Sequence, residues 1–374
     1  MSKVIRTIAT LMGLIIGAGV LGLPYVFMQA GFLTGVVVLV LIGFLVIMMN
    51  LYLGEITLRT KGIHQLPGYV EKYLGKKGKF FMCISLMITV YGALTGYLIG
   101  EGQAWSAILG VKPIYPMLVF CILMAIIVFK GLKLIEHLEY YFNIIVVSVL
   151  ALISIIALFF LEPSNLTGFH SSNLLIPYGV ALFALAGAAA IPDLKVELGK
   201  GELHKLKKVI FIGSIIPLIL YLLFATAVVG VTGLDTSQIA TIALGDYLGS
   251  YMLFMGNLFA IFTMATSFML LGLALVWMYH FDYKMKKILA WSLTLILPLA
   301  IALSGFASFV QVLAITGTFA GGIEGIMIVL SHRAAKNKSE RKPEYQIKNR
   351  FWLSTIMVAV YLFGMVYTLY TLFF

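Results

Sequence analysis

Backbone groups in one glycine-rich run could bind a small polar ligand without a charged side chain. Residues 13–24 read Gly-Leu-Ile-Ile-Gly-Ala-Gly-Val-Leu-Gly-Leu-Pro and lie inside a long apolar segment. Glycine and proline are poor helix formers, so a helix through this run should open and free N–H and C=O groups. At membrane depth such groups are tolerated only inside protein or along a wet cavity. The run therefore predicts a helix break that forms a binding site.

Three hydroxyl side chains could bind an ion. Thr263, Thr266 and Ser267 are spaced i, i+3 and i+4, so they share one face of a helix. Hydroxyl oxygens suit a hard cation, although serine and threonine also join helices to each other in membranes. Glu324 and Glu101 also lie inside apolar segments, where ionisable residues are usually functional. Either carboxyl group is a candidate proton carrier if the coupling ion is H⁺.

Two other interpretations of the glycine run were weighed. Gly13 and Gly17 form a small-xxx-small pair, which could simply seat a neighbouring helix. Gly17, Gly19 and Gly22 also match the spacing of a dinucleotide-binding fingerprint. That motif requires a preceding strand within a βαβ unit, and the surrounding sequence is continuously apolar. We therefore reject the dinucleotide interpretation and keep helix packing as the alternative.

The composition indicates which elements position these residues. Of the 374 residues, 61% are hydrophobic and 11% are charged, whereas a soluble domain has about 25% charged residues. We therefore predict an all-α polytopic membrane protein with about eleven transmembrane helices, each formed by an apolar run of about 20 residues. The predicted spans are 4–29, 32–57, 80–109, 115–129, 139–161, 173–194, 208–231, 251–280, 288–304, 307–330 and 351–374.

The positive charges predict the orientation of these spans. With the N-terminus in the cytoplasm, every one of the 26 lysines and arginines except Lys112 falls on the cytoplasmic side, as the positive-inside rule requires. The sequence therefore predicts a multi-pass protein of the plasma membrane with a cytoplasmic N-terminus and an external C-terminus. The net charge of +11 then reflects topology and indicates no nucleic-acid partner.

A second helix break is predicted in the span 173–194. The run Gly187-Ala-Ala-Ala-Ile-Pro192 repeats the glycine-to-proline spacing of Gly19-Val-Leu-Gly-Leu-Pro24. The two spans enter the membrane from opposite sides. Corresponding breaks in oppositely oriented halves are typical of inverted-repeat transporters. No paired carboxylates, histidine cluster or nucleophile converges in these spans, so we expect no enzyme activity and no cofactor other than a coupling ion, Na⁺ or H⁺.

Four motifs carry a resemblance to a known family. The runs 17–24, 54–59, 73–76 and 263–268 resemble the amino acid/auxin permease family, and within it the branch that carries aromatic and hydroxy amino acids. The resemblance covers nearly the whole chain and implies the amino acid–polyamine–organocation superfamily. It implies a 5 + 5 inverted repeat, with broken first and sixth helices and a peripheral eleventh. The corresponding parts are residues 1–162, 163–332 and 333–374.

The resemblance also implies an ion site. It places the hydroxyl face against the carbonyls of Gly13 and Ile16, at the sodium position of the superfamily. The candidate sodium site is therefore Gly13, Ile16, Thr263, Thr266 and Ser267. The fifth span lacks the lysine that replaces the ion in some members, which favours sodium, but proton-coupled relatives can keep the hydroxyls. The eighth span ends without the acidic, aromatic sequence expected of aromatic permeases, so the substrate class stays open.

A broken helix can satisfy both charged groups of an α-amino acid. Free N–H groups at the start of the outer half-helix would bind the carboxylate, and free carbonyls at both breaks would bind the ammonium group. Side chains of the third, sixth and eighth spans would line the pocket, although ordinary helix packing is the alternative for any single aromatic or methionine. The predicted substrate-binding residues are Ile16, Gly17, Ala18, Gly19, Val20, Tyr91, Phe183, Ala184, Ala186, Gly187, Met264 and Phe268.

These features predict a secondary transporter. We expect cation-coupled symport of a neutral, hydrophobic or aromatic amino acid by alternating access. The partners would be the amino acid and membrane lipid, and the protein would function as a monomer. The alternative is an amino-acid-sensing membrane receptor with the same fold and no net transport.

Overall fold

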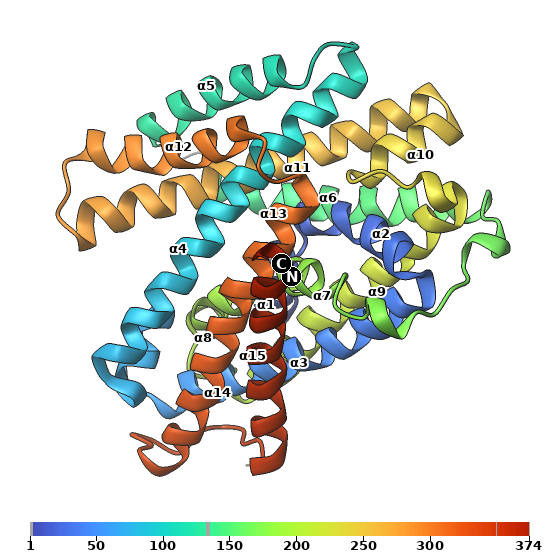
Figure 1. The fold of residues 1–374 in the computed structure, drawn as a ribbon. Helices are drawn as coiled ribbons and strands as arrows, with labels where there is room; N and C mark the ends of the chain where they lie inside the picture. The colour runs from blue at the N-terminus through green and yellow to red at the C-terminus, as the bar shows by residue number, and fades with distance from the viewer. Residues whose placement is uncertain (1–2, 132–134, 349, 374) are drawn as a thin grey trace.

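All regular elements that the structure describes are helices, which confirms the predicted all-α class. The structure is a computed structural model that describes residues 3–131, 135–348 and 350–373. The α-helices (Figure 1) are α1 (Lys3–Ile15), α2 (Gly19–Ala30), α3 (Phe32–Arg59), α4 (Leu66–Leu109), α5 (Ile114–Lys130), α6 (Ile135–Leu158), α7 (Tyr178–Ala184), α8 (Ile191–Leu198), α9 (Leu206–Thr232), α10 (Ala240–Leu248), α11 (Ser250–Trp277), α12 (Lys287–Ser304), α13 (Phe309–Thr316), α14 (Gly322–Asn337) and α15 (Phe351–Phe373).

The described helices account for the predicted apolar runs. Eight spans are long and apolar enough to cross a membrane, and α1 with α2 forms a ninth that is bent by 56°. Two shorter apolar helices, α5 and the segment Ile145–Leu158 of α6, match the remaining runs. The number of membrane crossings itself stays a prediction, because length and composition are its only basis.

Most helices pack in two groups, one around α4 and one around α9. The helices α5, α11, α12, α13 and α14 pack against α4, whereas α1, α2, α3 and α6 pack against α9. Figure 1 shows the long α4 with α5 and α12 on one side of the molecule, and α3 with α9 on the other. The breaks in α1–α2 and α7–α8 lie where these groups meet, and α11 contacts α6 there as well.

The segment before the third span differs from the prediction. Residues 58–79 were expected to form a connection outside the membrane, but α4 already begins at Leu66. Pro67 stands in the first turn, where its missing N–H has no intrahelical partner to lose. Gly75 interrupts the helix with φ 71° and ψ −168°, a conformation that glycine adopts without a steric penalty. The connection is therefore mostly a helical arm that bends into the span.

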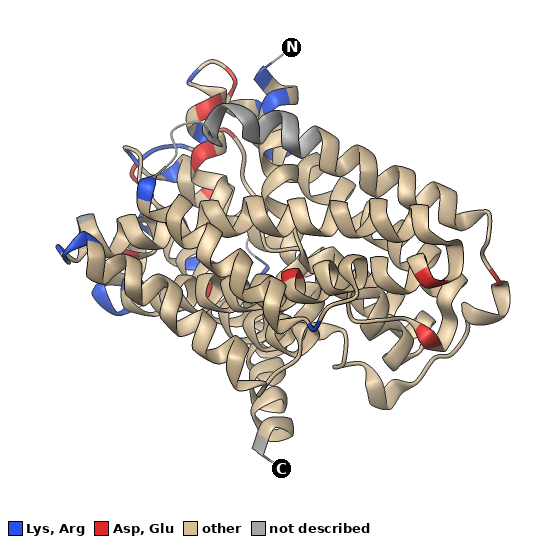
Figure 2. Cartoon of the chain, turned by 90° about the horizontal axis from the view of Figure 1, so that it is seen from above, with Lys and Arg blue, Asp and Glu red and all other residues tan. Residues whose placement is uncertain are grey.

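Charge divides the molecule into two ends. Figure 2 shows most lysines and arginines gathered at one end of the bundle, here named the basic end. Lys133, which the orientation prediction also used, lies outside the described residues. Between α9 and α11, the short helix α10 packs against α11. The linker 338–350 joins α14 to α15 at the basic end.

Candidate functional site

Both predicted helix interruptions are present. The helix α1 ends at Ile15 and α2 begins at Gly19. The helix α7 ends at Ala184 and α8 begins at Ile191, with one 3-10 turn between them. The first break is shorter than the run 13–24 suggested, because Gly22 and Pro24 lie inside α2. Gly22 and Pro24 were therefore poor guides to where the break ends.

The two helix breaks approach each other closely, and each has a glycine at the point of approach. A Cβ on Gly19 would stand 2.5 Å from the Ala184 Cα. Likewise, a Cβ on Gly187 would stand 2.6 Å from Ile15 Cγ1. Real side chains do not tolerate such separations, so only glycine lets the two backbones come this close. The glycines therefore bring the free backbone groups of both breaks to one place.

Tyr221 of α9 joins the two breaks. Its hydroxyl donates to the carbonyl of Ile15 at 2.7 Å and lies 3.2 Å from the carbonyl of Ala184. The backbone of Gly17 also makes a hydrogen bond with this hydroxyl. Tyr221 is completely buried and is not among the residues predicted from the sequence. The available signal was a hydroxyl group in the middle of an otherwise apolar span, where it must find a buried partner.

A cavity of about 490 Å³ lies beside the breaks. It is lined by most of the predicted site residues and by one face of α11. The predicted residues that line it are Gly13, Ile16, Gly17, Ala18, Gly19, Phe183, Ala184, Ala186, Gly187, Thr263, Thr266, Ser267 and Glu324. The two breaks, the hydroxyl face and one carboxyl group are thus brought together.

Three predicted pocket side chains lie outside this lining. Tyr91 turns to Tyr279, and their hydroxyl oxygens are 2.8 Å apart. Met264 is fully buried beside Gly100, where a Cβ would stand 2.5 Å from its sulfur. Phe268 packs edge-on against a phenylalanine of α5, with ring centroids 5.3 Å apart. In this structure these three side chains make helix-packing contacts, and their role in substrate binding stays a prediction.

Two further predicted residues also lie outside the lining. The N–H of Val20 bonds to the carbonyl of Gly17 at 3.4 Å, inside the first turn of α2, and its side chain is fully buried. It is therefore turned away from a ligand in the cavity. Glu101 is fully buried in α4, so the cavity gives it no access to substrate or to water in this conformation.

The contribution of α4 comes from a face that the sequence analysis did not choose. Leu86, Thr89, Ala93 and Tyr97 line the cavity and are spaced three, four and four residues apart. At 3.6 residues per turn they form one stripe. Tyr91 lies about 140° away from that stripe, which explains why it points elsewhere. Tyr97 also makes a side-chain hydrogen bond with Ser267. The sequence predicts this stripe only when the rotation of α4 about its own axis is known.

The hydroxyl face of α11 lies against the first break. A Cβ on Gly17 would stand 3.9 Å from Ser267 Oγ. Thr263 Oγ1 is buried and has no hydrogen-bond partner among the described residues, which leaves a polar oxygen that a cation could satisfy. Thr266 Oγ1 donates to carbonyls of its own helix, so its lone pairs remain available. Hydroxyl oxygens are a ligand type that suits an alkali cation, and the described residues contain no group of three His, Cys, Asp or Glu side chains that could hold a metal ion.

The cavity extends from the breaks toward the basic end. Leu86, Thr89 and Glu324 line it on that side, and Glu324 is only 8% exposed. Among the lining residues, Glu324 is the only one with an ionisable carboxyl group. On the opposite side the helices are packed, because a Cβ on Gly22 would stand 3.3 Å from Leu313 and 3.6 Å from Val180. The broken helix α2 is therefore in close contact with α7 and α13 at this end of the site.

An apolar helical bundle in which two interrupted helices meet at a central cavity defines the class of membrane transporters. The fold matches that of a solved structure described as "Crystal structure of MhsT in complex with L-phenylalanine". The TM-score is 0.67 and the sequence identity 18%, over 96% of this chain and 98% of that one.

The sequence identifies the family. The sequence model of the tryptophan/tyrosine permease family matches residues 1–370, so the chain belongs to this family. It is also 24% identical over 330 residues to "Glutamine transporter 2" of Aliivibrio fischeri (strain ATCC 700601 / ES114), which covers 84% of each chain. The prediction of a membrane amino acid permease that is not an enzyme is confirmed.

Proposed function

We propose that the protein is a cation-coupled symporter of a neutral, hydrophobic or aromatic amino acid that works by alternating access. One observation carries the proposal: the backbone groups of both helix breaks and the hydroxyl face of α11 line a single cavity. Of the two similar proteins, one holds L-phenylalanine in its crystal structure and the other is described as a glutamine transporter. Both amino acids are neutral, which supports a neutral substrate.

The substrate's charged groups would be bound by backbone. The N–H groups of Ala18 and Gly19 stand at the start of α2, where the helix dipole favours a carboxylate. Carbonyls of Ile16, Phe183 and Ala186 would accept from the ammonium group. Glu324, also on the cavity wall, would attract the ammonium group if it were ionised. The largely apolar lining leaves room for a hydrophobic side chain.

The coupling ion is proposed to be Na⁺. Thr263, Thr266 and Ser267 would hold it together with carbonyls of Gly13 and Ile16. A bound cation would supply a fixed positive charge that favours the substrate-competent arrangement of the breaks. The alternative ion is H⁺, with Glu324 as its carrier, because this carboxyl lines the cavity. Glu101, the other predicted carrier, has no such access.

The proposed membrane arrangement follows the charge distribution. Residues 1–162 and 163–332 would form the two inverted repeats, and 333–374 the linker and a peripheral helix, as expected for the aromatic and hydroxy amino acid branch of the amino acid/auxin permeases. With the basic end in the cytoplasm, the N-terminus is cytoplasmic, the C-terminus is external, and the cavity extends inward. The protein would function as a monomer in the plasma membrane.

The decisive experiment is uptake of radiolabelled amino acids into proteoliposomes under a sodium gradient, a proton gradient or neither. Accumulation that follows sodium and is lost in Thr263→Val and Ser267→Ala supports the sodium symporter. Accumulation that follows only the proton gradient and is lost in Glu324→Gln moves the coupling site to that carboxyl. Binding of an amino acid without flux under any gradient overturns the transporter and leaves the receptor.

A further inference from the structure

A second cavity lies at the basic end and shares no lining residue with the substrate site. It has a volume of about 460 Å³ and is formed by the end of α3, by α8 with the following loop, and by the linker 338–350. We call it the basic groove. Four cationic side chains and no carboxylate line it. The complete lining is Thr60, Lys61, Gly62, Ile63, Lys195, Val196, Gly199, Lys200, Leu203 and Arg341.

Lys195 forms the base of the basic groove. Its ammonium group donates to the carbonyls of Thr57 at 2.7 Å, Thr60 at 3.2 Å and Gly62 at 3.0 Å. Three N–H donors are thereby used at the carboxyl end of α3, where the helix dipole favours a cation. Lys195 therefore offsets the negative end of the helix, and the other cations of the groove are left to act on a ligand.

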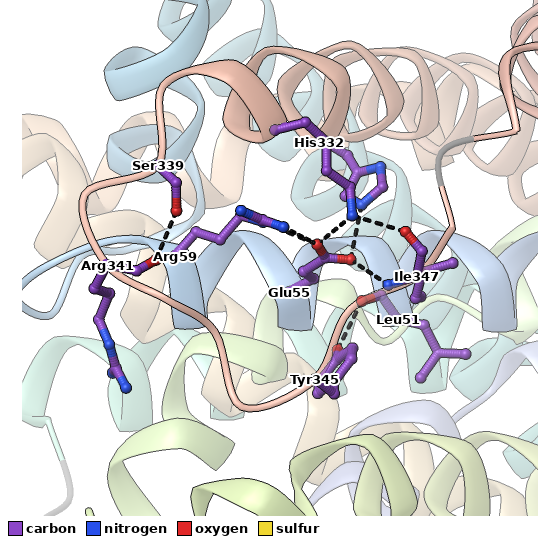
Figure 3. A network of polar contacts seen from close by, with 9 residues as sticks. Leu51, Glu55, Arg59, His332, Ser339, Arg341, Tyr345 and Ile347 are labelled. Carbon is purple, nitrogen blue, oxygen red and sulfur yellow. Dashed lines mark hydrogen bonds and ion pairs between the residues drawn. The ribbon is translucent and has the colours of Figure 1, made fainter.

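The linker is fixed beside the groove. The N–H groups of Glu340 and Arg341 donate to the carbonyl of Arg59 at 3.1 and 3.2 Å. The carboxylate of Glu340 accepts from the N–H of Lys61 at 2.6 Å and from Lys72 Nζ at 2.8 Å. Arg341 is thus held at the end of α3, and Figure 3 shows its side chain pointing away from Glu55 and Arg59.

The ammonium groups of Lys61 and Lys200 make no ion pair among the described residues. Arg341 pairs through one nitrogen with Glu344, and a guanidinium group has five donors. Two exposed apolar side chains border these cations, Ile63 at 66% and Val196 at 50% exposure. Unpaired cations next to exposed apolar groups match the two parts of a phospholipid, an anionic phosphate and an acyl chain.

We propose that the basic groove binds the phosphate group of an anionic membrane phospholipid. Lys61, Lys200 and Arg341 contact the phosphate, and Ile63 and Val196 contact the adjoining apolar part of the lipid. Basic pockets between membrane helices on the cytoplasmic side are suited to such headgroups. Because the segment after α3, the loop after α8 and the linker each contribute a cation, a bound lipid ties these three segments together.

The proposal is tested by native mass spectrometry of the full chain purified from membranes that contain phosphatidylglycerol. Each lysine near an anionic surface contributes about 1 kcal/mol, or about fivefold in affinity. Lys61→Gln and Lys200→Gln should each lower the retained phosphatidylglycerol about fivefold, and the double variant should lower it further. Lys77→Gln, on the same end but outside the groove, is the matched control. Equal retention in the double variant and the control overturns the site.

A second measurement separates a lipid from a soluble phosphate compound. Ile63→Asn should weaken retention of phosphatidylglycerol, because it removes exposed apolar contact without removing charge. Inorganic phosphate added to the lipid-bound protein should not displace the lipid. Displacement by inorganic phosphate, or unchanged retention in Ile63→Asn, overturns the phospholipid as occupant. Thermal unfolding of each variant, measured alongside, shows whether it is folded, and uptake assays are not needed for either result.

Discussion

The hydroxyl of Tyr221 lies 2.7 Å from the carbonyl oxygen of Ile15 and donates a hydrogen bond to it. The same hydroxyl lies 3.2 Å from the carbonyl of Ala184, so one side chain of α9 links the ends of α1 and α7. Free carbonyls are costly in an apolar interior. Tyr221 therefore satisfies one acceptor in each broken helix and holds the two breaks in a fixed relation.

Tyr221→Phe is expected to weaken this relation. Loss of a donor to buried carbonyls costs about 1–3 kcal/mol, so the variant should unfold at lower temperature and bind substrate more weakly. Both are measured on purified protein, by thermal unfolding with and without the transported amino acid. Tyr361→Phe is the control, since the one hydrogen bond of this buried hydroxyl among the described residues is to Met49 Sδ, at 3.8 Å, a weak acceptor. Equal losses in both variants would contradict a specific role for Tyr221.

Gly19→Ala is expected to abolish uptake. The added methyl group would stand 2.5 Å from the Ala184 Cα and 2.9 Å from its Cβ, so the two breaks must separate. Overpacking of this kind costs about 1–3 kcal/mol and displaces the N–H groups proposed to bind the carboxylate. Gly201→Ala is the control, because no atom lies within 4 Å of its added Cβ. Normal uptake by Gly19→Ala would show that the breaks need not touch.

The helical fold was predictable because its signals are strong and local. A helix in lipid must satisfy its own backbone groups, so each span appears in the sequence as a long apolar run. Positive charges gather at the cytoplasmic end of these runs. The run before Gly75 was missed as a helix because it carries polar residues on one face. Such an arm has the composition of a loop, and its helicity depends on tertiary packing of buried residues such as Tyr69 and Tyr73.

The backbone part of the site was predictable, and much of the side-chain part was not. Glycines at Gly17, Gly19 and Gly187 are local signals of a break, and all three line the cavity. Tyr91 and Tyr97 are both aromatic residues of the same span, and only the rotation of α4 decides which one faces the cavity. That rotation is set by packing against α11 and α13, which a single sequence does not contain. Tyr221 was missed because its partners are carbonyls of distant segments.

Glu55→Gln is expected to destabilise the basic end. The carboxylate of Glu55 is completely buried. It lies 2.8 Å from Arg59, 3.0 Å from His332 Nε2 and accepts from the N–H of Ile347 at 2.8 Å (Figure 3). It also lies 2.5 Å from Lys336 Nζ. Removing one partner of a buried ionic cluster costs about 3–5 kcal/mol, because the remaining charges lose their counter-charge.

The measurement for Glu55→Gln is its thermal unfolding in detergent, with Glu71→Gln as the matched control. Glu71 pairs with Lys79 at 2.7 Å, but both side chains are more than one third exposed, so its loss should cost about 0–1 kcal/mol. Similar melting temperatures for the two variants would mean that the Glu55 cluster does not stabilise the fold. A larger loss in Glu55→Gln would show that the linker is fixed through α3 and α14.

Glu340→Gln is expected to change the pH dependence of stability. Hydrogen bonds from Lys72 and from the N–H of Lys61 hold the pKa of the Glu340 carboxyl below its usual value. Because the pKa is lowered in the folded state, the charged form of Glu340 stabilises the fold at pH values above the ordinary glutamate pKa of about 4.3. This contribution to stability is lost as the pH falls through the lowered pKa. The contribution should be small, because the pair is partly exposed.

The difference in melting temperature between wild type and Glu340→Gln should therefore be present at neutral pH and vanish in acid. The same difference measured in a Lys72→Gln background should be smaller at neutral pH, and a difference that grows on acidification would contradict the assignment.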